Sequence, residues 1–523
     1  MLLTASDDLS PLGDPDIVVV GAGAIGLTVA LLLNRAGKRV VVLEAGKANP
    51  RSDYREENLG TNLGVHYDGI ARGRVRALGG TTRLWGGQLV PFLPEDFGTR
   101  GERPAWPVTY EEIEPWYRDA VRFLKLKQDW DPVSGARENG HAGRPYAGDR
   151  FEVGTHIWLP EPDFSRLYSE EIASSDVPIV LEAEVFNAEF GRDGEVSQVW
   201  FKSSAGERKS ISAKKFVLAT GTIEISRLLL NIQRLNPRSP IAALDCIGRN
   251  YVDHLHGVVG ELRDANVEQV RKFFDVYRKD GVKYSTKLRW ARGWLRENAT
   301  ANCASTLISS LTIRSAVSDL RDLLGRFYTG KSLSDFWGRL KSSVSILSIL
   351  APTLFRYAMT RRSDTFLGRE IKIALELEQL PCAESYVFLE QPEGRDYPRA
   401  GVSWGFDGRE RAAAEAFCAD LATFVEEQGL GRAEFGSLFV EDDQAFFSRF
   451  HDSAHHIGGA RMATRPEDGV VDRDLKVFGS SNLYVAGAAT FPSGSFANPT
   501  LTALAFAHRL AAEIGQANSG ERQ

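Results

Sequence analysis

The sequence contains few cysteines and no long apolar run. Its 523 residues include only four cysteines, which are widely spaced and form no CxxC pair: Cys246, Cys303, Cys382 and Cys418. This pattern favours free thiols and indicates neither a disulfide framework nor a zinc site. The N-terminus lacks the basic start and apolar stretch of a signal peptide, and no segment reaches the roughly 18 apolar residues of a membrane-spanning helix. We therefore expect a cytoplasmic protein with no membrane span.

An excess of positive charge is absent as well. The chain carries 63 basic and 69 acidic side chains, a formal net charge of −6, and 43% of its residues are hydrophobic. This balance gives no electrostatic indication of a nucleic-acid partner. The hydrophobic content is sufficient for a large folded core. We expect a globular protein whose partners are small molecules.

The first 46 residues predict a βαβ unit. After a polar segment at 1–14, expected to be a flexible arm, an unbroken β-branched run at 16–20 predicts a buried strand. The motif GAGAIG at 21–26 follows, then a predicted helix at 27–37 and a second buried strand at 39–46. A glycine-rich turn between a strand and a helix is typical of dinucleotide binding.

The glycine spacing in this unit predicts a site for a pyrophosphate. Gly21 permits the turn, Gly23 admits the pyrophosphate to the helix N-terminus, and Gly26 allows the helix to pack closely on the strand. Glu44, at the end of the second strand, is expected to accept hydrogen bonds from an adenosine ribose, and it disfavours a 2′-phosphorylated nucleotide. These residues alone are compatible with either FAD or NAD.

A second glycine-rich loop, LGGTTRLWGG, covers residues 78–87. A cofactor site built from two such loops suits a dinucleotide bound in an extended conformation, and we expect Gly79, Gly80 and Thr81 to contact it. The alternative interpretation is a flexible surface loop. Trp85 is compatible with a position near a flavin and with a position in the core.

The remainder of the chain mixes strands and helices. Strands are predicted at 178–190, 196–203, 214–219, 305–313, 370–379 and 482–488, and helices at 106–126, near 222–232 and at about 499–515. An apolar segment at 343–355, flanked by arginine and lysine, is too short to span a bilayer. We expect it to form a buried helix broken near Pro352, and the alternative is an interfacial helix or lid.

Several ordered motifs resemble the glucose–methanol–choline (GMC) oxidoreductase family. Besides the N-terminal unit and the GGTT loop, they are KKFVLATGTIEISRLLL (214–230), IGRNYVDH (247–254), HHIGGARM (455–462), GVVDRDLKVFGSSNLYVAGAATFP (469–492) and NPTLTALAFA (498–507). The family pattern has Gly-Thr after its catalytic histidine, whereas this chain has Gly458 and Gly459. The asparagine of ANPTLT resembles the pyranose-oxidase and sugar-dehydrogenase side of the family.

The resemblance implies an α/β fold with a Rossmann-type FAD-binding domain and an inserted α+β substrate domain built on an antiparallel sheet. The FAD-binding domain is expected from three separated segments, 15–95, 176–257 and 459–518. The substrate-binding domain is expected to comprise 96–175 and 258–458.

The resemblance also implies a catalytic pair. His455 corresponds to the family's base, with the neighbouring His456 as the alternative, and Asn498 corresponds to the second catalytic position. An imidazole suits removal of the hydroxyl proton during alcohol oxidation, and an amide can orient the hydroxyl. Further cofactor contacts are implied for Val185, Gly487, Pro499 and Thr500.

Two other histidines, His254 and His256, alternate along a predicted strand. Alternation places them on one face, but no third ligand is indicated, so we interpret them as structural and expect no metal site. His451 is expected at the surface or behind the site.

The predicted activity is FAD-dependent oxidation of an alcohol group of a sugar, glycoside or polyol by hydride transfer to the flavin. Because covalently flavinylated relatives carry histidine before the loop tryptophan and this chain has Arg83-Leu84-Trp85, we expect non-covalent FAD. The electron acceptor could be dioxygen, a quinone or a protein. Alternatives are a tailoring dehydrogenase for a natural-product sugar or another alcohol, an NAD-dependent dehydrogenase, and a flavin-binding protein without activity.

Overall fold

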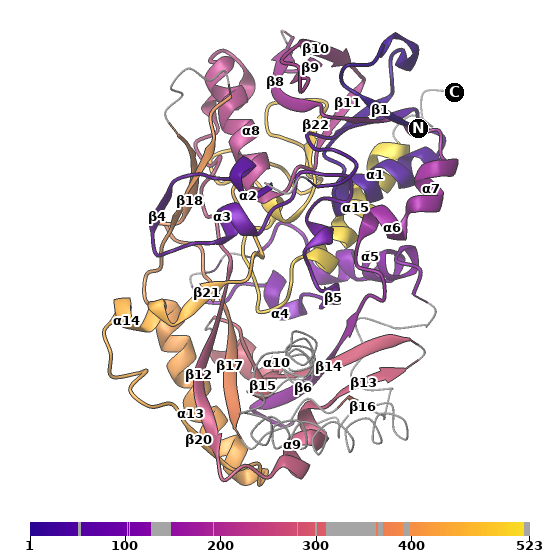
Figure 1. Cartoon of the computed structure of the whole chain (residues 1–523). Helices are drawn as coiled ribbons and strands as arrows, with labels where there is room; N and C mark the ends of the chain where they lie inside the picture. Colours follow the sequence, from indigo (N-terminus) through magenta and orange to yellow (C-terminus); the bar gives the residue numbers. More distant parts are fainter. Residues whose placement is uncertain are drawn as a thin grey trace, which may run out of the picture.

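A computed structural model describes residues 1–50, 54–101, 103, 105–126, 148–191, 193–279, 281–298, 301–309, 362–363, 370–390 and 397–516. A parallel sheet with its helices forms one half of the molecule, and a broad antiparallel sheet forms the other (Figure 1). The apolar segment at 343–355, expected as a buried or interfacial helix, lies outside the described residues.

The parallel sheet has six strands in the order β1-β7-β3-β2-β11-β22. Their bounds are β1 Leu2–Thr4, β7 Ile179–Leu181, β3 Val40–Leu43, β2 Ile17–Val20, β11 Lys215–Leu218 and β22 Leu483–Val485. Every residue of β2 and β3 is buried, as their β-branched runs predict for strands covered on both faces. The strands predicted at 16–20, 39–46, 214–219 and 482–488 are confirmed. The strand predicted at 178–190 is instead two strands, at 179–181 and 184–190, which belong to different sheets.

The start of the chain differs from expectation. Leu3 of β1 pairs in parallel with Val180 of β7, and Ser10–Leu12 forms a short 3₁₀ turn. The prediction of a flexible arm at 1–14 is therefore wrong for these residues. Their partner strand lies far along the chain, so local polarity alone gave no indication of the pairing.

Four helices cover this half: α1 (Ala24–Arg35), α5 (Tyr110–Phe123), α8 (Thr222–Leu235) and α15 (Thr500–Gln516). Helix α15 packs against both α1 and α5 and is buried along most of its length (Figure 1). A small antiparallel sheet follows β7 and comprises β8 (Glu184–Phe190), β9 (Val196–Lys202) and β10 (Arg208–Ser212). The C-terminal helix is thus held in the same core as the first βαβ unit.

The second half is built on a ten-stranded sheet whose main path is β16-β13-β14-β15-β17-β12-β20, and β6 pairs with β14. The strands are β5 (Gln88–Leu89), β6 (Phe151–Trp158), β12 (His254–Arg263), β13 (Val276–Lys279), β14 (Val282–Trp290), β15 (Cys303–Ser309), β16 (Arg362–Ser363), β17 (Ile371–Glu378), β20 (Arg432–Glu434) and β21 (Phe450–Asp452). The strands predicted at 305–313 and 370–379 correspond to β15 and β17. Helix α13 (Arg409–Glu427) packs against β15, β17 and β20, so one face of this sheet lies against a second apolar core.

The remaining described elements are a third sheet and several short helices. A third sheet has the order β18-β19-β4, with bounds Tyr386–Leu389, Ala400–Trp404 and Asn62–Gly64. The short helices are α2 (Tyr54–Glu57), α3 (Gly69–Arg72), α4 (Pro94–Phe97), α6 (Phe164–Leu167), α7 (Ser169–Ser174), α9 (Val267–Phe274), α10 (Arg292–Asn298) and α14 (Asp443–Ser448). The expected domain boundaries stay a prediction. Most strands of the two sheets lie in the regions expected for them, but β1 lies in the expected arm, β5 lies in the expected FAD-binding segment 15–95, and β12 crosses the expected boundary at 257/258.

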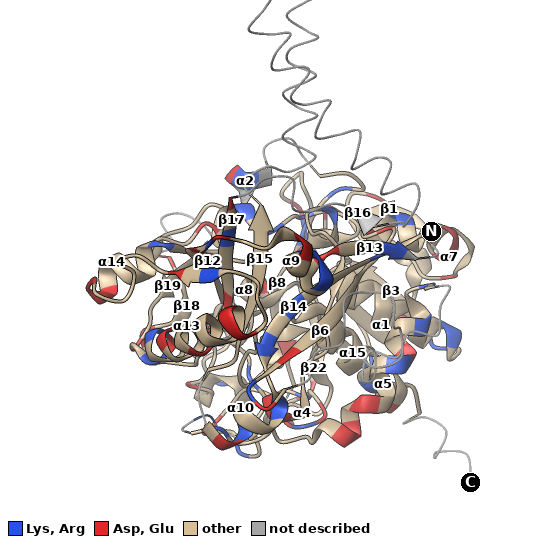
Figure 2. Ribbon diagram, turned by 90° about the horizontal axis from the view of Figure 1, so that it is seen from below, with Lys and Arg blue, Asp and Glu red and all other residues tan. Residues whose placement is uncertain are grey.

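Charges of both signs are interspersed along the ribbon (Figure 2), as the near balance of acidic and basic residues predicts. Within the described part of the chain, no helix combines the length and apolar character needed to cross a membrane.

Candidate active site

Two glycine-rich turns touch each other beside the parallel sheet. A Cβ on Gly26 would lie 1.8 Å from the carbonyl oxygen of Gly21, so glycine is required there for α1 to pack against β2. Gly80 has φ +56°, and a Cβ on it would lie 2.9 Å from Cα of Gly23. The Gly79 N–H donates to the Ala22 carbonyl at 2.9 Å. The second loop is therefore part of the cradle and not a loose surface loop.

A cavity of about 580 Å³ opens at this cradle. Its wall includes most of the predicted site residues: Gly21, Gly23, Glu44, Gly80, Thr81, Val185, His455, Gly487, Asn498, Pro499 and Thr500. Gly26 and Gly79 do not line it and instead support the two turns from behind. Gly23 and Gly80 present backbone without side chains to the cavity, which leaves room for a pyrophosphate. The hydroxyl of Thr220 is buried at the same wall without a hydrogen-bond partner among the described residues, so it could bind a polar group of an extended dinucleotide.

Glu44 holds the turn and still offers acceptor capacity to the cavity. One carboxylate oxygen accepts the Ala22 N–H and the other accepts the Gly46 N–H, each at 2.8 Å. Burial raises the pKa of this carboxyl, and the two N–H donors oppose that shift. Since each carboxylate oxygen has a second lone pair, Glu44 can also accept from ribose hydroxyls.

The expected catalytic pair is in contact. Asn498 Nδ2 lies 3.1 Å from His455 Nε2, and both side chains line the cavity. An amide nitrogen can only donate, so His455 Nε2 accepts and its proton lies on Nδ1. Asn498 Oδ1 is buried and has no hydrogen-bond partner among the described residues. The pair therefore presents one basic nitrogen and one amide group to the same space.

His254 supports the ring of His455 from behind. Its Nδ1 lies 3.0 Å from Nδ1 of His455 and accepts a hydrogen bond from the N–H that this tautomer places there. The interpretation of His254 as a structural residue missed this contact, because His254 and His455 lie far apart in the sequence and no local pattern indicates that they meet. His256 instead contacts His451, with ring nitrogens 3.2 Å apart.

Burial sets the charge of these rings. It lowers the pKa of His455 to about 4, aided by the cation of Lys287 and opposed by the carboxylate of Glu376. Burial lowers the pKa of His456 to about 3. Both imidazoles are therefore neutral at neutral pH and able to accept a proton.

His456 also lines the cavity, but its surroundings differ. Its ring packs near those of Tyr67 and Tyr251, and its Nε2 lies 3.9 Å from Asp253 Oδ2. Its backbone carbonyl accepts from the Thr222 hydroxyl at 2.7 Å. It has no contact with Asn498 comparable to that of His455, and this favours His455 of the two.

Asp253 holds the loop that carries the histidines. Its Oδ1 accepts the backbone N–H of His455 at 2.8 Å and of His254 at 2.7 Å, and its Oδ2 accepts from the Tyr67 hydroxyl at 2.8 Å. Burial raises the pKa of this carboxyl to about 7, and the nearby Asp452 carboxylate adds to the shift. Sequence reasoning did not single out Asp253, although the motif IGRNYVDH contains it.

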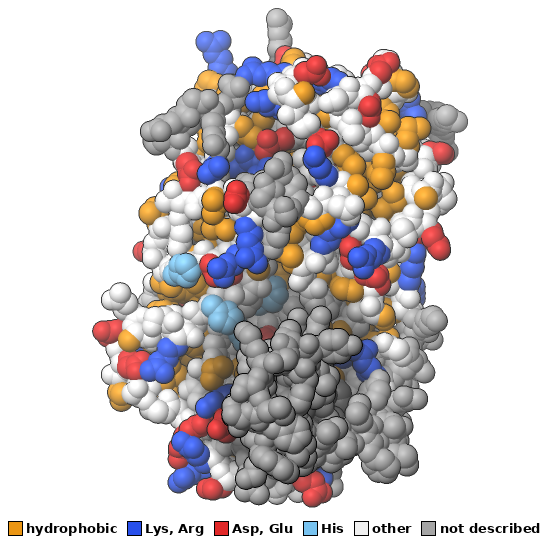
Figure 3. All heavy atoms as spheres, viewed as in Figure 1, with side chains coloured by type: hydrophobic (Ala, Val, Ile, Leu, Met, Phe, Trp, Pro, Cys, Tyr) orange, Lys and Arg blue, Asp and Glu red, His pale blue; other side chains and the backbone are white. Residues whose placement is uncertain are grey.

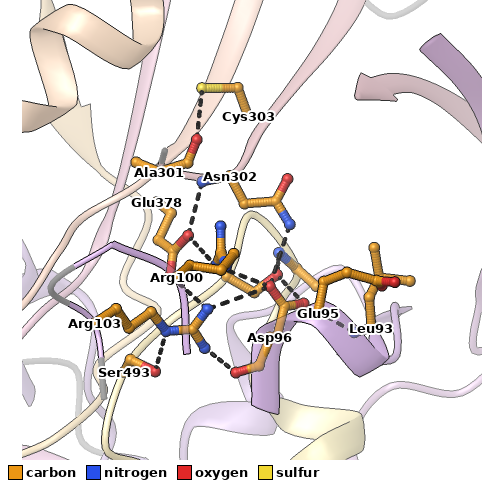
Figure 4. A network of polar contacts seen from close by, with 12 residues as sticks. Leu93, Glu95, Asp96, Arg100, Arg103, Ala301, Asn302, Cys303, Glu378 and Ser493 are labelled. Atoms are coloured by element: carbon orange, nitrogen blue, oxygen red, sulfur yellow. Dashed lines mark hydrogen bonds and ion pairs between the residues drawn. The ribbon is translucent and has the colours of Figure 1, made fainter. Parts of the chain in front are cut away.

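A buried ionic network anchors the loop that leads to Asn498 (Figure 4). Arg100 lies 2.8 Å from Glu378 and 3.3 Å from Asp96, and Arg103 donates to the Ser493 hydroxyl at 2.6 Å. The Ser495 hydroxyl donates to Asp96 at 2.8 Å. The loop before Asn498 is thus tied to the end of β17 through paired charges.

A second charged cluster lines the cofactor side of the cavity. Glu224 forms ion pairs with three arginines, Arg74, Arg76 and Arg227. Burial alone would raise the pKa of Glu224, but the three positive charges hold it well below the usual range. Sequence reasoning missed this cluster too.

On the face drawn in Figure 3, charges of both signs are mixed and histidine side chains gather near the middle.

No group of three or more histidine, cysteine, aspartate or glutamate side chains able to hold a metal ion occurs among the described residues. The four cysteines are free thiols, and three of them are buried.

Comparison with known proteins gives matches at both ends of the chain. The family described as GMC oxidoreductase matches residues 381–507, and the family described as FAD dependent oxidoreductase matches residues 16–243. The large subunit of fructose dehydrogenase from Gluconobacter japonicus is 22% identical over 95% of this chain and 97% of its own length. Paromamine 6′-oxidase from Streptomyces fradiae is 22% identical over 95% of this chain and 91% of its own.

Among solved structures, formate oxidase of Aspergillus oryzae superposes with a TM-score of 0.58 at 16% identity, covering 97% of this chain and 99% of that one. This similarity supports the shared fold. The two family matches confirm FAD as the expected cofactor, and they leave the nicotinamide alternative without support.

Proposed function

Because the chain belongs to the GMC oxidoreductase family and is an FAD-dependent oxidoreductase of alcohols, we propose that it oxidises an alcohol group of a sugar, glycoside or polyol to a carbonyl. The contact between His455 Nε2 and Asn498 Nδ2 on the cavity wall carries this proposal. His455 is the base, and Asn498 orients the substrate hydroxyl.

The hydrogen-bond directions suit this division of roles. FAD, when bound, supplies the hydride acceptor. A substrate hydroxyl that enters between the two side chains donates to His455 Nε2 and accepts from Asn498 Nδ2, which replaces their mutual contact. His455 then takes the hydroxyl proton on Nε2, while its Nδ1–H stays bonded to His254.

We propose that the cavity residues named above hold FAD without a covalent bond. The residues before Trp85 are Arg83 and Leu84 and not a histidine, and the Arg83 guanidinium donates to the Leu78 and Ala48 carbonyls at 2.8 Å each. Helix α15 begins at Thr500 on the cavity wall, so its positive N-terminal end favours negative charge there.

The substrate class is proposed from the relatives. Fructose dehydrogenase and paromamine 6′-oxidase carry sugar-related names, and both align with nearly the whole chain. A tailoring reaction on a natural-product sugar is the second candidate, favoured by the match to paromamine 6′-oxidase. The acceptor, whether dioxygen, a quinone or a protein, and a cytoplasmic location also belong to the proposal.

The purified protein provides a direct test. We expect flavin absorption bands that move to the supernatant on acid precipitation and are bleached anaerobically by a member of a sugar and polyol panel. Flavin that stays in the pellet contradicts the non-covalent assignment. If no panel member bleaches the flavin while a simple aliphatic or aromatic alcohol does, the proposed substrate class is wrong.

The base is tested by substitution. His455→Ala is expected to retain FAD and to slow anaerobic flavin reduction by a factor of about 100 or more. The control is His66→Ala, since the His66 side chain is 84% exposed. If His455→Ala reduces at the wild-type rate and His456→Ala does not, the base is His456.

A further inference from the structure

One face of the ten-stranded sheet carries polar residues that are buried or half-buried. Antiparallel register places Lys287 of β14 beside Gly154 of β6, and Ser285 beside His156 on the same face. Across the sheet, Glu376 of β17 pairs with His256 of β12 on this face. The alternate residues, such as Leu288 and Leu375, point to the other face and join the core under α13. A buried polar face of this kind needs partners for its polar groups.

The charges nearest the middle of this face cancel. Lys287 is 4% exposed, and its ammonium forms an ion pair with the Glu376 carboxylate. Arg289 is paired with Glu152 at 2.9 Å. Burial lowers the pKa of His156, His254 and His256, so these rings carry no charge at neutral pH.

The ion pair reaches the catalytic cavity through a chain of contacts. Lys287 Nζ donates to Gln88 Oε1 at 3.3 Å, and Gln88 lines the cavity. Trp158, also on the cavity wall, donates its indole N–H to Ser285 at 2.8 Å. On the other side, His254 of β12 lies opposite Glu378 of β17 in the strand register, so Glu376 is the diagonal neighbour of His254. The ring of His254 contacts His455.

We infer that the Lys287–Glu376 ion pair determines substrate specificity because its two charges cancel each other beside the cavity, so that the site favours uncharged polyhydroxylated substrates over amino- or carboxylate-bearing ones. This inference rests on the proposed function and adds the charge class of the substrate. Gln88 offers both a donor and an acceptor, and the Trp158 ring offers an apolar surface, which together suit the hydroxyl groups and C–H faces of a neutral sugar.

Removing one member of the pair should change this preference in a direction set by the remaining charge. Lys287→Met leaves the Glu376 carboxylate uncompensated and should favour a cationic substrate. Glu376→Gln leaves the Lys287 ammonium uncompensated and should favour an anionic one. Lys283, whose ammonium lies 3.7 Å from the centroid of the Trp158 ring, is unchanged in every variant and so affects none of the comparisons.

The experiment compares kcat/KM for three forms of one sugar, taken from whichever neutral panel member reduces the wild-type flavin: the neutral sugar, its 2-amino analogue and its uronate. Lys287→Met should raise the ratio of amino to neutral sugar by about tenfold or more, and Glu376→Gln should raise the ratio of uronate to neutral sugar similarly. Lys372→Met is the matched control, because Lys372 lies on β17 like Glu376 and its ion pair is with Glu261 of the neighbouring strand β12.

The double variant Lys287→Met/Glu376→Gln restores neutrality and should return both ratios to near the wild-type values, which general structural damage would not do. If Lys287→Met fails to fold, Glu376→Gln tests the same inference with the opposite sign. Ratios that stay within twofold of wild type in the single variants that fold, or shifts that persist in the double variant, overturn the inference. A wild-type enzyme that no sugar or polyol reduces refutes the proposed function instead.

Discussion

The buried network in Figure 4 allows a quantitative stability prediction for Glu378→Gln. Glu378 is fully buried and faces Arg100 at 2.8 Å and Arg103 at 3.7 Å, with the Asn302 N–H at 2.7 Å. With Asp96, the network holds two positive and two negative charges, so loss of one carboxylate leaves one buried positive charge uncompensated. Breaking a buried pair in this way costs about 3–5 kcal/mol.

The expected change in melting temperature follows from the size of the chain. An unfolding entropy of about 2 cal/mol/K per residue means that about 1 kcal/mol shifts the Tm of a chain this long by about 1 °C. Glu378→Gln should therefore lower Tm by about 4 °C in a calorimetric or fluorescence melt. Glu261→Gln is the control, since solvent screens its ion pairs with Lys372 and Arg263 and such exposed pairs contribute little to stability. Equal Tm values for the two variants would refute the assignment of buried charge compensation to Glu378.

Two further predictions concern the base and the cofactor cradle. Since the pKa of His455 is lowered to about 4, its ring gains a proton only near that pH, and the anaerobic flavin-reduction rate should stay constant from pH 7 to about 5.5 before it falls. A rate that drops about eightfold over that interval would indicate a base with the ordinary histidine pKa of about 6.5. Gly80→Ala should lower the FAD content of the purified protein, because its Cβ would meet Cα of Gly23 at 2.9 Å. Gly13→Ala is the control, because Gly13 has a similar φ of +59° but a Cβ there would meet no atom within 4 Å. If both variants lose FAD equally, backbone strain alone explains the loss and the close contact with Gly23 does not.

Local sequence patterns were sufficient for the elements that bind the dinucleotide. The β-branched runs before Gly21 and before Glu44 predicted β2 and β3, and the observed strands lie within the predicted ranges. The glycine spacing predicted the close packing found at Gly26 and the position of Gly23 on the cavity wall, whereas Gly79, which was expected to contact the cofactor, does not line the cavity. The strand and packing predictions succeed because strand burial, helix initiation and glycine conformation depend mainly on residues close together in the chain.

The proposed catalytic pair could be predicted only through the family resemblance. His455 and Asn498 are 43 positions apart, and no periodicity connects them. Their contact depends on two loops, one held by Asp253 and the other by the network around Asp96, which lie far from both residues in the sequence. A pattern within either loop carries no information about the other.

The sequence by itself therefore determined the class of fold, the dinucleotide cradle and, by resemblance, the family and its expected base. The tertiary structure alone decided that the first residues join the parallel sheet, that His254 supports His455, and that Lys287 and Glu376 neutralise each other beside the cavity. Local geometry follows from steric and hydrophobic preferences of neighbouring residues. Charge compensation and proton direction depend on groups that only the folded chain brings within a few ångströms of each other.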